Sequence, residues 1–83
     1  MIFLNKTVLS FFIKTLNVES SSRYLKLLGY SFTKSEIEII LPYLKQNVHL
    51  LEKQNKDYLL KNLPSNISSY SKYQLSKLFD QYI

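Results

Sequence analysis

The residues of this chain that could catalyse a reaction are few and poorly placed for it. His49 is the one histidine, and Glu52 follows it closely enough for a carboxylate to assist an imidazole acting as a general base. Glu36 and Glu38 are two positions apart, so on a helix they point to different faces and form no carboxylate pair. No G-x-S-x-G elbow accompanies the many serines, and the single glycine excludes a glycine-rich phosphate loop. We therefore predict that the protein is not an enzyme, with a hydrolase that uses His49 as an alternative.

The sequence also contains few residues that could bind a metal or another cofactor. The chain has no cysteine, and one histidine cannot form a metal cluster without help from carboxylates, so we expect neither a metal nor another cofactor. A chain without cysteine is compatible with a reducing compartment, and we expect a cytoplasmic protein.

The N-terminal stretch MIFLNKTVLSFFIKTL has the apolar content of a signal peptide. However, Lys6 and Lys14 interrupt its apolar run, and no cleavage site of small residues follows. No apolar run anywhere in the chain reaches the roughly 18 residues that span a bilayer. We predict that this stretch belongs to the mature fold, either as a centrally packed helix or as a docking helix.

Tyrosine and basic residues are unusually frequent in this chain, and this is the feature of the composition that points most directly to a function. The chain has seven tyrosines, five phenylalanines and a formal net charge of +5. A small domain cannot bury all of these rings, so we expect exposed aromatic surface, and tyrosine anchors many interfaces. The basic excess lies in residues 1–35, where Glu19 is the one acid against Lys6, Lys14, Arg23, Lys26 and Lys34. Alternatively, codon bias in an AT-rich genome explains the excess of lysine and tyrosine, and several of the aromatic rings are half-buried in the core.

These observations favour a non-enzymatic protein-interaction module, an adaptor or an inhibitor that docks through an aromatic and basic helical surface. A mobile-element product that blocks a host or defence enzyme would be one form of such an inhibitor. Phe3 adds to the aromatic excess of the first helix, and the predicted partner-binding residues are Phe11, Phe12, Arg23, Tyr24 and Lys26. The alternative is a non-specific nucleic-acid-binding protein that uses the basic N-terminal half for phosphates and its tyrosines for stacking. Base-specific recognition is not expected, because Arg23 is the only arginine.

Helices must position these residues, because the sequence shows helical spacing and no convincing strand. We predict a single all-α domain over residues 1–83, with four to five helices packed as an orthogonal bundle. Its predicted core is formed by apolar residues that recur at helical spacing: Leu25, Leu28, Ile37, Ile40, Leu41, Leu44, Leu59, Leu60, Leu63, Leu75, Leu78 and Phe79.

Local signals predict where the helices begin and end. Asn17 can cap a helix that ends before Gly29, and Thr33 with Glu36 has the spacing of a capping box. Pro42 follows inside the same helix, and we predict that it bends this helix without ending it.

The later helices are predicted in the same way. The stretch EKQNKDYLLKNL reads as one helix that Pro64 terminates, with acid-first ion pairs of Glu52 with Lys56 and of Asp57 with Lys61. Ser68 or Ser69 can cap the last helix.

The order of these features resembles that of a known family. The first segment, NVESSSRYLKLLGYSFTKSEIEIILPYLK, contains a Gly-aromatic turn and then a Thr-capped helix. The second, QNVHLLEKQNKDYLLKNL, contains a short apolar link and then a Leu-rich helix. The third, ISSYSKYQLSKLFDQYI, ends in a helix with Leu and Phe. This pattern, over about Leu16 to Tyr82, is similar to that of the YqfT-type family of small uncharacterised proteins from low-GC Gram-positive bacteria. The resemblance implies a helical fold and carries no functional site.

Overall fold

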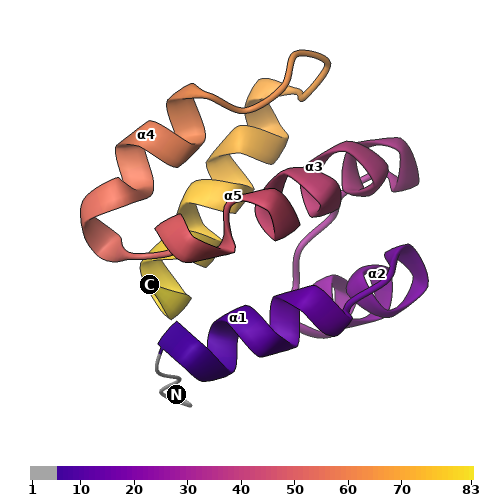
Figure 1. Ribbon diagram of the computed structural model, residues 1–83. Coiled ribbons are helices and arrows are strands. Elements are labelled where there is room, and N and C mark those ends of the chain that lie inside the picture. Colours follow the sequence, from indigo (N-terminus) through magenta and orange to yellow (C-terminus); the bar gives the residue numbers. More distant parts are fainter. Residues whose placement is uncertain (1–5) are drawn as a thin grey trace.

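Five α-helices and two short 3₁₀ turns make up the regular structure of the computed structural model, which describes residues 6–83 (Figure 1). Within these residues there is no strand, so the all-α prediction is confirmed. None of the described helices is long and apolar enough to cross a membrane. The prediction for Phe3 lies outside the described residues. In chain order the elements are α1 (Lys6–Thr15), α2 (Val18–Leu27), α3 (Lys34–Gln46), η1 (Val48–Leu50), η2 (Lys53–Asn55), α4 (Lys56–Lys61) and α5 (Ser69–Tyr82).

The caps of α2 follow the sequence signals. The side-chain oxygen of Asn17 accepts the backbone N–H of Ser20 at 2.8 Å, which satisfies one of the free donors at the helix start. At the other end Gly29 has φ +91°, a conformation that is strained for residues with a side chain. The N–H of Tyr30 bonds to the carbonyl of Leu25 at 2.8 Å, and that of Gly29 to Lys26 at 3.1 Å. This pair of bonds is a Schellman motif, which turns the chain toward α3.

Helix α3 begins at the predicted capping box and runs through its proline. Thr33 accepts the N–H of Glu36 at 3.1 Å, and the Glu36 carboxylate accepts the N–H of Thr33 at 3.3 Å. The helix continues past Pro42 to Gln46, so the prediction that Pro42 does not end it is confirmed. Pro42 and Glu38, whose carbonyl loses its helical donor to the proline, are both exposed. Water can therefore hydrate the freed carbonyl.

The segment before Pro64 differs from its prediction. Instead of one helix from Glu52, the chain forms η2 and then the short α4, and the side chain of Lys56 bonds to Asp80 of α5. The hydroxyl of Tyr43 also donates to the carbonyl of Leu59 in α4, at 2.8 Å. Contacts with α3 and α5 therefore position this segment, and Glu52 precedes η2 instead of sharing one helix with Lys56 as predicted.

The core forms where α1, α3, α4 and α5 meet. Leu59 of α4 is completely buried, and the buried cluster around it is formed by Leu9, Ile40, Val48, Leu51, Ile67, Leu75 and Phe79. Helix α3 lies between the α1–α2 pair and α4 in Figure 1, and it contacts both α1 and α2. The radius of gyration, 11.8 Å, is that expected of a compact chain of this length, about 12 Å.

Half of the predicted core residues are buried and one is misplaced. The buried ones are Ile37, Ile40, Leu41, Leu59, Leu75 and Phe79. Five are half-buried: Leu25, Leu44, Leu60, Leu63 and Leu78. Leu28 is wrong, because it is 47% exposed. The helical spacing predicts that Leu28 shares a face with Leu25, but Leu28 is the C-cap, just beyond the last residue of α2, and borders the groove instead.

Candidate functional site

An apolar groove of about 800 Å³ opens between α1, α2, α3 and α5. This volume lies within the range of roughly 300–1,000 Å³ that is typical of ligand pockets. Among the side chains that the structure describes, those of residues 7–83, none that lines the groove is charged. The walls from the first two helices are formed by Val8, Leu9, Phe12, Ile13, Leu16, Ser21, Tyr24, Leu25 and Leu28.

The other two helices supply the remaining surface of the groove. Ile37 and Ile40 of α3 belong both to the buried set and to the groove lining, so the groove continues from the core rather than lying apart from it. The α3 lining also includes Leu41 and Leu44, and α5 supplies Leu75, Leu78, Phe79, Gln81 and Tyr82. Phe32, Leu51 and Ile83 complete the lining from segments outside the α-helices.

Helical spacing explains why α1 and α2 present apolar walls. Val8 and Phe12 are four residues apart, as are Leu9 and Ile13, so their side chains follow one broad face of α1. On α2 the same spacing joins Ser21 to Leu25 and Tyr24 to Leu28.

The rim of the groove is exposed although it is apolar. Val8 is 46% exposed, Tyr24 48% and Leu28 47%, and all three line the groove. Phe12 and Tyr24 connect its two walls, because their rings pack edge to face with centroids 5.3 Å apart and planes at 75°. A contiguous exposed apolar surface of this kind marks interaction sites in small proteins.

One polar group inside the groove has no partner. Ser21 is 6% exposed and lines the groove, and its hydroxyl oxygen makes no hydrogen bond. The other buried polar side chains among the described residues, Glu36, Ser71 and Gln74, all make hydrogen bonds.

The structure divides the predicted partner-binding residues. It brings Phe12 and Tyr24 together in the groove, whereas Phe11 is 71% exposed outside the lining. Arg23 and Lys26 are exposed and do not line the groove. Of the predicted residues, the groove therefore includes the aromatic Phe12 and Tyr24 and neither Arg23 nor Lys26.

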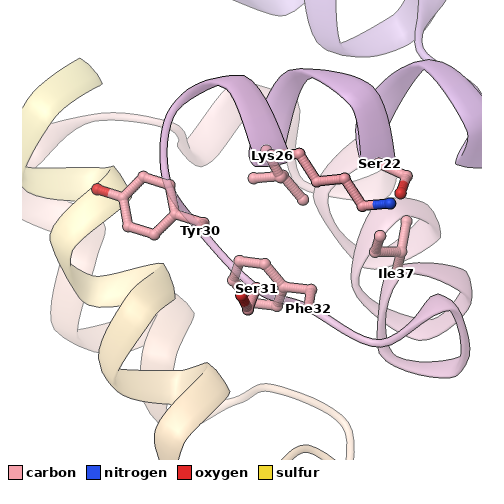
Figure 2. Close-up of a pocket in the computed structure, with 7 residues that line it drawn as sticks. Ser22, Lys26, Tyr30, Ser31, Phe32 and Ile37 are labelled. Carbon is pink, nitrogen blue, oxygen red and sulfur yellow. The ribbon is translucent and has the colours of Figure 1, made fainter.

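Lys26 borders a second, much smaller pocket of about 120 Å³. The pocket is shown in Figure 2, where the Lys26 side chain extends along α2 toward Ser22, and Tyr30 and Phe32 come from the loop before α3. Leu25, Phe32 and Ile37 border both pockets, so these side chains separate the small pocket from the groove.

The residues weighed for catalysis lie apart from the groove. His49 is exposed in η1, and Glu38 is exposed on α3. Within the described residues, no group of three or more histidine, cysteine and acidic side chains is arranged to hold a metal ion.

Glu36 has a role that the capping box only partly indicated. Its carboxylate accepts the N–H of Thr33, the N–H of Ser68 at 3.0 Å and the hydroxyl of Ser71 at 2.6 Å. Ser68 in turn caps α5 by accepting the N–H of Ser71 at 3.1 Å. We call these four residues, Thr33, Glu36, Ser68 and Ser71, the Glu36 junction; it joins the starts of α3 and α5.

The charge of Glu36 is stabilised although the side chain is buried. Burial by itself raises the pKa of a carboxylate, because it removes the charge from water. The hydrogen bonds from Ser71, Ser68 and Thr33 outweigh this effect and lower the pKa of Glu36 from 4.5 to about 2. Glu36 is therefore ionised at neutral pH.

Polar contacts also join the α2–α3 loop to α5. Gln74 accepts the backbone N–H of Ser31 at 2.8 Å and donates to the carbonyl of the same residue at 2.7 Å. The hydroxyl of Tyr30 donates to Gln81 at 2.8 Å. These three bonds fix the end of the α2 wall against the α5 wall. They connect residues 43 and 51 positions apart, a separation at which no sequence motif points to a pairing.

Comparisons with protein-family models, with curated proteins and with solved structures found no match for this chain. The resemblance to the YqfT-type family stays a prediction.

Proposed function

We propose that the protein is a non-enzymatic interaction module, an adaptor or an inhibitor, that binds one helix of a partner protein in the apolar groove. The observation that carries this proposal is the groove itself, which is about 800 Å³ in volume and uncharged along its described lining. Burying one large apolar side chain stabilises a complex by about 1.5–3 kcal/mol. Several such anchors together oppose the loss of translational and rotational freedom on association, which costs roughly 4–15 kcal/mol.

The shape of the groove favours a helix as the occupant. Helices α1, α2, α3 and α5 surround it, so an additional helix can continue their packing with ridges in the grooves between side chains. Amphipathic helices bind such sites through apolar residues at positions i, i+3, i+4 and i+7. The half-exposed side chains of Val8, Tyr24 and Leu28 supply contacts at the rim.

The same lining argues against nucleic acid as the occupant. A phosphate backbone gains affinity by releasing counterions at lysine and arginine side chains, and the described lining of the groove contains neither. Arg23 and Lys26 lie elsewhere on α2. A hydrophobic complex should persist in salt, whereas non-specific nucleic-acid binding should be lost at a few hundred millimolar salt.

The test uses two adjacent leucines on α2. A displayed library of amphipathic helices of about 18 residues, or five turns, is selected on the protein at about 0.5 M salt. Leu28, 47% exposed, lines the groove, whereas Leu27, 83% exposed, does not. We expect Leu28→Glu to weaken the selected helices about tenfold or more and Leu27→Glu to change affinity less than about twofold. Circular dichroism checks that both variants are folded.

Two outcomes would contradict the proposal. One is that no helix is enriched above background. The other is that the two glutamate variants weaken binding equally, which would place the contact on the exposed side of α2 or attribute the loss to charge alone.

A further inference from the structure

We infer that the small pocket beside α2 binds a carboxylate group carried on a short apolar stem. Lys26 and Ser22 donate to the carboxylate, and the apolar side chains of the lining cover the stem. The pocket volume of about 120 Å³ is well below the roughly 300–1,000 Å³ of sites for larger ligands. The ligand is therefore one small group, either a free short-chain carboxylic acid or the side chain of a glutamate in a partner protein.

The ammonium of Lys26 is available to an anionic ligand. It is the one charge of the described lining, and no residue three or four positions away along the chain is an acid. Glu19, the one acid of α2, lies 4.0 Å from Lys34 of α3 instead. Among the side chains of residues 7–83, none makes an ion pair with Lys26.

The hydroxyl of Ser22 supplies a second donor beside this ammonium. Ser22 precedes Lys26 by four residues, so the two side chains share one face of α2. Figure 2 shows the end of the Lys26 side chain next to Ser22. Ser22 is half-buried, and its hydroxyl makes no hydrogen bond to any described group. An ammonium and a hydroxyl side by side match the two acceptor oxygens of a carboxylate.

The rest of the lining favours a carboxylate on a stem over a bare anion. Leu25, Phe32 and Ile37 all border the pocket, and Ile37 is the most buried residue of the described lining, at 4% exposed. A bare anion gains nothing from these apolar side chains, whereas each methylene group that leaves water favours binding. The same three residues separate the pocket from the groove, so the inference does not depend on the proposed function.

The first experiment titrates butyrate into the isotope-labelled protein at constant ionic strength and records the amide signals by NMR. We expect saturable shifts through the millimolar range at Ser22, Lys26 and Phe32. Butanol has a stem without the charge, and inorganic phosphate has charge without a stem. We expect neither of them to saturate these signals in the range in which butyrate does.

Variants on α2 then test the donors. Lys26→Gln should weaken butyrate binding about three- to fivefold, the effect of one exposed ion pair, and Ser22→Ala about twofold. Arg23→Gln is the matched control, because Arg23 is an exposed cation of the same helix outside the pocket lining. It should leave the affinity for butyrate unchanged. Circular dichroism checks that the three variants are folded.

A third probe distinguishes the two sources of the carboxylate. N-acetylglutamate amide presents a glutamate side chain between two peptide groups, as a partner protein would. Binding of this probe as tight as that of butyrate assigns the pocket to a glutamate of a partner. Binding of butyrate alone assigns it to a free carboxylic acid, and both results support the pocket as a carboxylate site.

Three results would overturn the inference. The first is the absence of saturable shifts with both carboxylates. The second is an equal loss of affinity in Lys26→Gln and Arg23→Gln, which would mean a general attraction of anions to α2. The third is binding of butanol or phosphate as tight as that of butyrate, which would remove the need for the charge or for the stem. None of these results bears on the selection of helices for the groove.

Discussion

The Glu36 junction and the apolar groove use adjacent residues of α3 in opposite ways. Glu36 is buried among hydrogen-bond donors that it fully engages, whereas Ile37 is buried along a groove that contains an unpaired hydroxyl. Hydrogen bonds are directional, so the junction admits one arrangement of the starts of α3 and α5. Apolar contacts are not directional, so the groove can accept side chains of different shapes. The comparison indicates that this small chain fixes the starts of α3 and α5 through directional bonds at the junction, whereas mostly apolar side chains line the neighbouring groove.

Removing the Glu36 carboxylate should have the largest effect. Glu36→Ala leaves the N–H groups of Thr33 and Ser68 and the hydroxyl of Ser71 without their acceptor, at an expected loss of about 3 kcal/mol in the free energy of unfolding. Urea unfolding followed by circular dichroism measures it. Glu38→Ala on the same helix is the control, because Glu38 is exposed and its loss should stay within about 0.5 kcal/mol. Equal losses for the two variants would show that the junction does not organise the fold.

Acid should weaken the junction before it affects the groove. The pKa of Glu36 is about 2 in the folded protein against an ordinary value of 4.5, so its contribution to stability is complete above pH 4.5 and is lost as the pH falls toward 2. We expect this residue to account for a decrease of about 2 kcal/mol in the free energy of unfolding over that interval. Unfolding curves are measured at several pH values, and the free energy of unfolding should change more steeply with pH for the natural protein than for Glu36→Gln. Parallel curves would contradict the assignment, and Glu38→Gln should retain the natural slope.

A substitution in the groove should cost less stability than either change at the junction. Tyr24→Ala removes the edge-to-face contact with Phe12, and since Tyr24 is 48% exposed we expect a loss of about 1 kcal/mol. Tyr70, 62% exposed on α5, is the matched control, and Tyr70→Ala should change stability little. Thermal unfolding is measured beside binding of the selected helices, which Tyr24→Ala alone should weaken. A loss as large as that of Glu36→Ala would mean that Tyr24 is a core residue and that its effect on binding is indirect.

The sequence predicted those features of the fold that depend on residues within one helical turn. The sequence identifies Asn17 and the pair of Thr33 and Glu36 as caps, because the donor and acceptor of a cap are two to three residues apart. For α5 it offers Ser68 or Ser69, and the cap is Ser68. Gly29 was recognised because its positive φ is difficult for other residues.

Features that depend on distant residues were not predicted. Glu36 binds Ser68 and Ser71, 32 and 35 residues away, and nothing in the sequence marks those serines as its partners. Lys56 has an acid four residues before it, but it pairs with Asp80 on another helix. The groove was missed for the same reason, since helical spacing identifies an apolar face but does not say which part of that face a neighbouring helix covers. Thus Leu28 was assigned to the core, although it lies on the rim.

The side-chain amide of Gln74 binds the main chain of the loop before α3 in the way that a backbone peptide group binds another. It presents a carbonyl and an N–H to the N–H and carbonyl of Ser31, which are main-chain groups that every residue except proline possesses. Gln74 on α5, 43 residues downstream, therefore fixes this part of the loop through the main chain of Ser31 and not through its side chain. Position 31 is left free to vary in side chain, whereas position 74 must supply both a donor and an acceptor, which glutamate cannot do when ionised.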